Sequence, residues 1–320
     1  MANSASAWYQ VDGDDALPEQ PITKDGEPTG SSCRTKSGEL FVDDDFPAAA
    51  TSIHGRVEEG ASDVPQCRCR LPAHRSTMQK GSSRSRLFWH CGRQNGCNFF
   101  RWVTHLERLS SQVWWQRLEN FSLVQDTGFR ADDLLQGAVG DCWFLSALAV
   151  IAERPDLILR LFRGETTTQR SGRYEVQLFL EGKWSTVVVD DQLPCIGSAA
   201  QRRPDGSGLA FSRAKDRQLW VPLVEKAYAK AHGSYKAISG GSVAEALLDL
   251  TGAPCESIDL EDLDRSPGEL WEQLVGYHLS GLPMGCGTAG HPELAEVGLV
   301  GYHARLGTVF VGDRGTASSI

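Results

Sequence analysis

A cysteine stands where a glycine-rich turn gives way to an apolar run. The stretch QGAVGDCWFLSALAV, residues 136–150, places Cys142 at the predicted first turn of a helix. Backbone N–H groups without intrahelical partners, together with the helix dipole, stabilise an anion there, so a thiol loses its proton more readily. A thiolate at this position suits nucleophilic attack on an acyl group. The alternative interpretation is a structural cysteine at a helix cap.

A nucleophile of this kind needs an oxyanion donor and a base. Gln136 lies six residues earlier and could direct its amide N–H, with the Cys142 backbone N–H, at a developing oxyanion. Gly137 and Gly140 would let the backbone approach a substrate closely. Of the eight histidines, His303 follows EVGLVGY, a predicted strand end that could hold a base rigidly. A histidine beside a strand is also compatible with a purely structural role, so spacing alone leaves both interpretations open.

The surrounding pattern predicts elements that could hold such groups. A helix should run from Cys142 to near Pro155, followed by a β-hairpin over 174–191 that turns at Glu181 and Gly182. Apolar spacing predicts another helix over 218–233.

Beyond this helix the pattern changes. The segment SGGS, residues 239–242, is predicted to be a flexible joint, and Ser242 with Glu245 forms a predicted capping box. Ser266, Pro267 and Glu269 open a further predicted helix to about Leu279, and residues 280–320 are typical of strands and turns. The order of elements indicates an α+β fold in two lobes.

Composition bounds the class of protein. The chain has 320 residues, of which 41% are hydrophobic and 23% charged, and no apolar run reaches the roughly 18 residues of a membrane span. Residues 1–15 lack a basic residue and an apolar core, so we expect no signal peptide and an intracellular, cytoplasmic location. In a reducing compartment, nine cysteines favour metal binding or catalysis over disulfides.

A basic segment interrupts an otherwise acidic chain. Nine basic residues and one acidic residue lie between Cys67 and Arg108, although the whole chain has a net charge of −9. The same segment carries a Cys-x-Cys pair and a Cys-x5-Cys pair, which supply four thiolates for a tetrahedral Zn²⁺ site: Cys67, Cys69, Cys91 and Cys97. His74 or His90 could replace one thiolate, and a cysteine-rich loop without metal is the alternative.

Several long blocks resemble the catalytic core of the calpains, papain-related cysteine proteases. They are QGAVGDCWFLSALAVIAERPDLILRLF, FVDDDFPA, WWQR, VVVDDQLPC, LWVPLVEKAYAKAHGSYKAISGGSVAEALLDLTG, PMGCG and GLVGYHA. The resemblance implies a papain-like two-lobe core, with a mainly helical lobe and an incomplete β-rich lobe. It also implies that Cys142 is the nucleophile, Gln136 the oxyanion donor and His303 the general base. The cleft would be hinged near Gly240 and Gly241.

The resemblance also implies calcium binding. Asp133 takes the place of a carboxylate ligand, while Asp126 and Gly128 take the places of backbone-carbonyl ligands. Calcium favours such oxygen ligands. Gln218 stands where the family has a glutamate, which removes a negative charge from the site. The alternative for Asp133 is a turn or helix-capping role.

One family block is missing from the sequence. The third catalytic residue of the family is an asparagine in a later RNPWG-like block, which orients the histidine ring. After Ala304 this sequence continues RLGTVFVGDRGTASSI instead. We therefore expect this polypeptide, as a C-terminally truncated core, to cleave peptides poorly.

The basic segment resembles a GRF-type zinc finger through its ending, FWHCGRQNGCNFFRW, residues 88–102. Fingers of this type often contact single-stranded nucleic acid, and arginines interleaved with aromatics suit base stacking. The aromatics could instead form the small core of the finger, and the basic face could hold an acidic protein. The predicted organisation is a disordered leader, the start of the core, the zinc-finger insert, protease lobe one and an incomplete lobe two, at residues 1–37, 38–56, 57–110, 111–240 and 241–320.

Two functional hypotheses result. The first is an intracellular, calcium-dependent cysteine endopeptidase that acts on protein substrates and carries a zinc-finger insert. The second is an impaired protease fragment that acts as a zinc-finger binding module for single-stranded nucleic acid or an acidic protein. A zinc hydrolase is disfavoured, because the sequence has no His-Glu-x-x-His pattern and four thiolates leave no open metal position.

Overall fold

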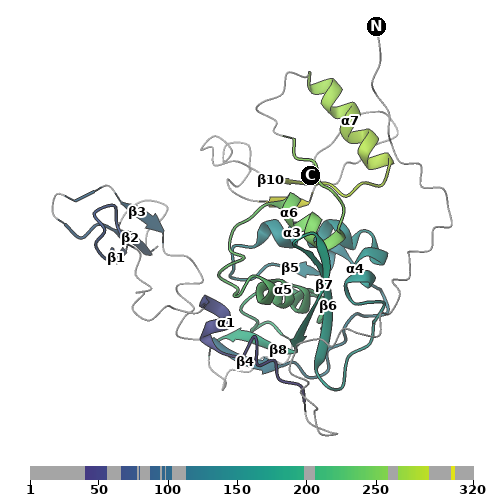
Figure 1. Cartoon of the computed structure of the whole chain (residues 1–320), viewed down its shortest axis with the longest axis horizontal. Coiled ribbons are helices and arrows are strands. Elements are labelled where there is room, and N and C mark those ends of the chain that lie inside the picture. Colours follow the sequence, from purple (N-terminus) through teal and green to yellow (C-terminus); the bar gives the residue numbers. More distant parts are fainter. Residues whose placement is uncertain are drawn as a thin grey trace. The chain divides into compact units, whose positions relative to one another are not determined.

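The computed structural model describes residues 40–55, 66–77, 79, 87–93, 96–97, 99–102, 113–197, 206–258, 266–287 and 304–306. The predicted leader and His303 lie outside these residues. The described elements combine helices with small antiparallel sheets (Figure 1). No helix among them is long and apolar enough to cross a membrane. In chain order they are α1 (Ala50–His54), β1 (His74–Thr77), β2 (Leu87–His90), β3 (Phe100–Trp102), β4 (Val113–Arg117), η1 (Ala131–Asp133), β5 (Leu134–Leu135), α3 (Cys142–Ala152), α4 (Pro155–Leu161), β6 (Arg173–Leu180), β7 (Lys183–Asp190), β8 (Gln192–Ile196), β9 (Arg213–Ala214), α5 (Trp220–Ala231), α6 (Val243–Thr251), α7 (Pro267–Leu279), β10 (Gly285–Gly287) and β11 (Ala304–Leu306).

The helix that begins at Cys142 forms as the sequence predicts. Most of its side chains are buried in the main core. Pro155 does more than end it, because a second helix, α4, starts at this proline. Proline suits the first position of a helix, where its fixed φ is favourable and its missing N–H would have no partner.

Helix α5 lies deeper in the protein than its sequence indicates. The pattern predicts one apolar face, but residues 220–229 are all buried. The helix contacts the hairpin formed by β6 and β7, and it also contacts β9 (Figure 1). Two charged residues, Glu225 and Lys226, are consequently held in the interior.

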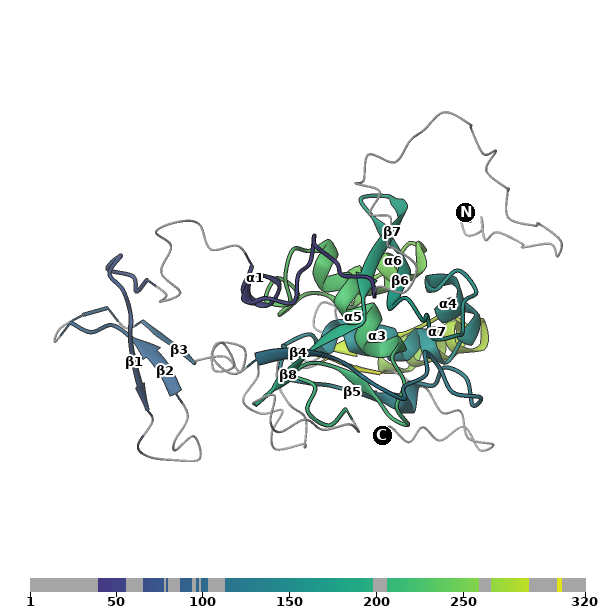
Figure 2. The same ribbon diagram turned by 90° about the horizontal axis from the view of Figure 1, so that it is seen from below.

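The predicted hairpin is confirmed. Strands β6 and β7 pair antiparallel from Arg173 opposite Asp190 to Leu180 opposite Lys183. The turn residues have positive φ angles of 52° at Glu181 and 77° at Gly182, which suit a two-residue hairpin loop. Strand β4 pairs with β8 in a second antiparallel sheet (Figure 2).

Residues 40–55, which precede the basic segment, are hydrogen-bonded to the part of the protein that contains β7 and α5. The backbone N–H of Asp43 donates to the Asp190 carboxylate at 3.0 Å, and Lys230 donates to both Asp43 carboxylate oxygens at 2.6 and 2.8 Å. The backbone N–H of Tyr235 donates to the carbonyl of Ser52 at 3.0 Å. Residues 40–55 therefore belong to the structure that carries α5.

The predictions for the later part of the chain are met in part. Ser266 and Glu269 form the predicted capping box at the start of α7. Ser242 precedes α6, but its side chain makes no capping hydrogen bond, so the box predicted there is wrong. Strands β10 and β11 pair antiparallel, and both lie beside α3.

Candidate active site

The turn before Cys142 is bound on one side by the segment that leads into β9. The backbone N–H of Ala138 donates to the carbonyl of Ala210 at 2.9 Å. At Gly137 a Cβ atom would lie 2.2 Å from backbone atoms of Phe211, so no larger residue fits without moving that backbone. This close approach explains why a glycine stands there.

The other side of the turn is bound by the predicted joint. The backbone N–H of Gly240 donates to the carbonyl of Gly140 at 2.9 Å, and the Trp143 indole N–H donates to the carbonyl of Ile238 at 3.1 Å. A Cβ at Gly241 would lie 2.5 Å from the Trp143 ring. In this structure the segment is thus held against the cysteine-bearing turn, whereas the sequence predicts a flexible joint.

Cys142 occupies the first position of α3. It is half-buried, at the edge of the main core. Gln136 is exposed in the same turn, and its amide Nε2 donates to the carbonyl of Val139 at 3.3 Å. The structure thus places both residues on one turn, with the Gln136 amide directed at its own backbone.

His303 cannot be placed, because it lies outside the described residues. The next residue, Ala304, begins β11, and this strand lies beside α3. Strand β11 and the cysteine-bearing helix are therefore close in space at the level of their backbones.

A buried carboxyl pair lies next to Cys142. Asp141 directly precedes Cys142 and is fully buried, and its carboxyl oxygens have no hydrogen-bond donor among the described residues. The carboxyl group of Glu225 on α5 lies against it. Two ionised carboxylates only accept, so their contact becomes a hydrogen bond when one of them is protonated. Ser212 already donates to Glu225 through its N–H at 3.1 Å and its hydroxyl at 2.7 Å.

The pKa shifts indicate which carboxyl keeps the proton. Burial, and after it the charge of Glu225, raises the pKa of Asp141 well above its usual value. Burial also raises the pKa of Glu225, while hydrogen bonds from Asp141 and Ser212 oppose that rise. The pair is best described as a protonated Asp141 that donates to an ionised Glu225. A neutral Asp141 leaves no negative charge in the residue beside the Cys142 sulfur.

The stability of the wild type is expected to fall as pH rises, and the variant Asp141→Asn should not show this fall. Because the folded-state pKa of Asp141 is raised, its contribution is full below the ordinary carboxyl pKa and is lost as pH rises above it. A buried polar group left unsatisfied costs on the order of 1–3 kcal/mol, and more when it is ionised, whereas asparagine always carries an N–H. Thermal midpoints compared from about pH 5 to 9 test this. The exposed Asp156→Asn is the control, and a difference between wild type and Asp141→Asn that does not vary with pH would contradict the assignment.

The sequence argument did not single out Asp141, Glu225 or Lys226. One signal could have found them. Asp141 directly precedes an almost wholly apolar helix, and the other two stand together inside the run LWVPLVEKAYAKA. Charged residues in such surroundings are expected to be paired.

Comparison with known proteins identifies the family. The family described as calpain family cysteine protease matches residues 98–308, about two thirds of the chain. The chain belongs to the calpain family. It is 40% identical over 180 residues to the calpain-type cysteine protease DEK1 of Zea mays, covering 54% of this chain and 8% of that protein. It is 33% identical over 189 residues to calpain-10 of Rattus norvegicus, covering 56% and 27%, and 33% identical over 183 residues to calpain-A of Drosophila melanogaster, covering 55% and 21%. The matched part thus spans less than a third of each of these relatives.

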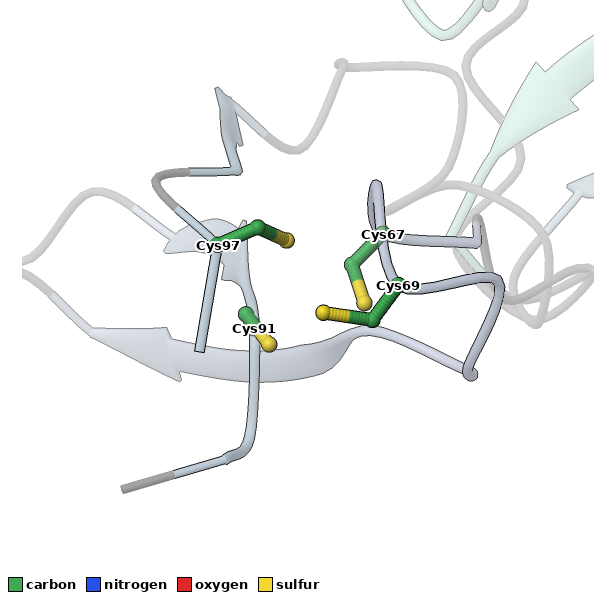
Figure 3. A group of neighbouring side chains, drawn as sticks. All are labelled: Cys67, Cys69, Cys91 and Cys97. Atoms are coloured by element: carbon green, nitrogen blue, oxygen red, sulfur yellow. The ribbon is translucent and has the colours of Figure 1, made fainter. Parts of the chain in front are cut away.

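The four cysteines of the basic segment converge in this calpain-family chain. Their sulfur atoms all lie within 4.8 Å of one another and point toward a common centre (Figure 3). Sulfur ligands of a tetrahedral zinc ion lie about 3.8 Å apart, so the cluster needs little adjustment to hold one. Burial would raise the pKa of Cys97, but hydrogen bonds led by those from Cys69 lower it to about 7.

The structure also bears on the alternatives for this segment. Both ring nitrogens of His90 are engaged, one with the Ser76 hydroxyl at 2.8 Å and one with the Cys91 carbonyl at 2.9 Å, so His90 is not a metal ligand as placed. Strands β1, β2 and β3 form a three-stranded sheet, and Trp89 is buried against Ala73. Trp89 therefore belongs to the interior and is not available for base stacking.

The residues implied in calcium binding do not form a fitting site. Asp133 is buried, but the Gln218 amide Nε2 donates to its carboxylate at 2.9 Å. Asp126 is exposed, and Gly128 lies in the same turn with a φ of 75°. A calcium ion needs oxygen lone pairs directed at it, whereas here an N–H donor faces the one buried carboxylate.

Proposed function

We propose that this chain carries the catalytic core of an intracellular cysteine endopeptidase in which Cys142 is the nucleophile. The observation that supports this most is the position of Cys142 at the first turn of a buried helix. The turn that precedes it is hydrogen-bonded to neighbouring segments on both sides. Membership of the calpain family gives the reaction class. The positive end of the helix dipole favours the thiolate.

The reaction follows from the named groups. His303 takes the Cys142 thiol proton, and the sulfur attacks the carbonyl carbon of the scissile peptide bond. The Cys142 N–H and the Gln136 amide donate to the oxyanion once that amide turns from the Val139 carbonyl. The tetrahedral intermediate collapses with cleavage of the C–N bond, and the amine leaves with the proton from His303. Water then hydrolyses the thioester and restores the thiol.

Site-resolved alkylation with iodoacetamide tests this proposal. Cys142 should be modified before the exposed Cys255 and Cys286, and replacement of His303 by alanine should abolish that preference. Equal labelling of all thiols would favour the second candidate, a binding module built on the basic insert. That candidate is supported by the four converging thiols.

We also propose that Cys67, Cys69, Cys91 and Cys97 hold a structural zinc ion in a finger-like insert. We propose that this insert binds an acidic protein surface. The buried Trp89 weakens the case for single-stranded nucleic acid. Calcium dependence is left out of the proposal, because an amide and not a second carboxylate faces Asp133.

A further inference from the structure

Gln218 is buried where the chain leaves β9 and enters α5, and its whole amide group is engaged. Its Oε1 accepts from the backbone N–H of Gln125 at 3.1 Å. Its Nε2 donates to Asp133 Oδ2 at 2.9 Å and to the carbonyl of Lys215 at 3.3 Å. One side chain therefore joins the 125–128 turn, η1 and the 215–219 segment.

The orientation of this amide is fixed by its neighbours. Reversing it would set its NH₂ against the Gln125 N–H and its oxygen against the Asp133 carboxylate. Both contacts would be repulsive, because a donor would face a donor and an acceptor would face an acceptor. The observed orientation is the one that satisfies all three partners.

Other hydrogen bonds reinforce the same junction. The backbone N–H of Lys215 donates to the Asp133 carbonyl at 2.9 Å, and the Gln125 side chain donates to the Asp216 carbonyl at 2.8 Å. Asp216 has a φ of 54°, so the segment turns tightly there. Direct hydrogen bonds thus tie the three segments together.

The junction lacks the charge that a divalent cation needs. Asp133 is its one buried carboxylate among the described residues, since Asp126, Asp132 and Asp216 are exposed. The Asp133 carboxylate and the Lys215 carbonyl both accept from the amide nitrogen, so an N–H donor faces both of these oxygens. Binding an ion would require this nitrogen to leave and its hydrogen bonds to break.

We infer that the Gln218 amide does the cross-linking that a calcium ion would do at this junction, so that the junction is assembled without calcium. This goes beyond the proposed peptidase activity and does not depend on it.

A thermal-melting experiment with CaCl₂ tests the inference. In the wild type, millimolar CaCl₂ should give no rise in melting temperature that depends on Asp133. The variant Gln218→Glu places a second carboxylate opposite Asp133, so it should melt lower without divalent ions. It should regain on the order of 5 °C in CaCl₂. The variant Asp133→Asn is made both in the wild type and in Gln218→Glu. It identifies how much of any change in melting temperature arises at this junction.

Two results would overturn the inference. The first is a rise of several degrees in wild type with CaCl₂ that Asp133→Asn abolishes, because the ion would then displace the amide. The second is an unchanged melting temperature in Gln218→Met. This variant removes the amide without adding charge, and it replaces Gln218→Glu as the test if Gln218→Glu does not fold. Its melting temperature should fall in the presence and absence of CaCl₂, and an unchanged value would show that the amide holds nothing together. Since the readout is melting, failure here is distinguishable from failure of the peptidase proposal.

Discussion

Replacing Lys226 with methionine should lower the free energy of unfolding by about 3–5 kcal/mol, the usual penalty for leaving a buried charge uncompensated. Lys226 is fully buried on α5. Its ammonium pairs with the Asp190 carboxylate and donates to the carbonyls of Asp190 at 3.0 Å and Gln192 at 2.7 Å. It also lies over the Trp115 ring at 5.5 Å. Methionine fills similar space but removes all three polar contacts.

The pKa directions support the same expectation. Burial alone would raise the pKa of Asp190, but the charge and hydrogen bond of Lys226 bring it below its usual value. Burial lowers the pKa of Lys226, and Asp190 offsets only part of that. Because the folded-state pKa of Asp190 is depressed, its contribution is present above the unfolded pKa and is lost as pH falls through the folded value. The deficit of the Lys226→Met variant should therefore shrink at acid pH.

Two further variants isolate the charge effect. The exposed Lys183→Met is a matched control and should change stability by no more than about 0.5 kcal/mol. Adding Asp190→Asn to Lys226→Met removes the buried charge that has lost its countercharge, but it also sets an NH₂ group against N–H donors of Asp43 or Gln192, so it should recover only part of the loss. Chemical denaturation measures all three. A loss below about 1 kcal/mol for Lys226→Met alone would contradict the account of this pair.

The second large effect is expected at the cysteine cluster. Purified protein should contain about one zinc ion per chain, since apparent binding free energies of structural zinc are roughly 10–16 kcal/mol. Cys69→Ser or Cys97→Ser should lose that metal, because the three remaining thiolates no longer complete the tetrahedron. The exposed Cys255→Ser, outside the cluster, should retain it.

Metal content by mass spectrometry, with limited proteolysis, checks this prediction. Among its described residues, the segment around β1, β2 and β3 has only a small buried cluster, centred on Ala73 and Trp89. A cluster of that size cannot stabilise a module without a metal or cross-link, so chelation should expose the segment to protease. Equal zinc content in Cys69→Ser and Cys255→Ser would rule out the proposed ligand set.

Local signals in the sequence predicted much of the framework. The β6–β7 hairpin follows from alternating apolar residues and a Glu-Gly turn, all within one short stretch. The capping box at Ser266 and Glu269 is equally local. The four cysteines could be predicted as a set because two close pairs of thiols within one basic segment supply the four ligands of a tetrahedral zinc site.

The remaining features depend on tertiary contacts that no local pattern contains. Asp133 and Gln218 are 85 residues apart, and only folding reveals that the amide faces the carboxylate. The burial of Glu225 depends on segments packed around α5 from distant parts of the chain. Ser242 shows the reverse error, since a sequence with the correct capping spacing forms no capping bond.

The central claim is that Cys142 is the reactive nucleophile, and its alkylation rate tests that most directly. Rates of reaction with iodoacetamide are measured at about pH 7 for each cysteine by peptide mass mapping, in wild type and in His303→Ala. We predict that Cys142 reacts at least about tenfold faster than the exposed Cys255, whose pKa is raised by partial desolvation of its thiol and by the charge of Asp249, and that His303→Ala removes this advantage. A Cys142 rate equal to that of Cys255 in wild type, unchanged by the histidine substitution, would contradict the account.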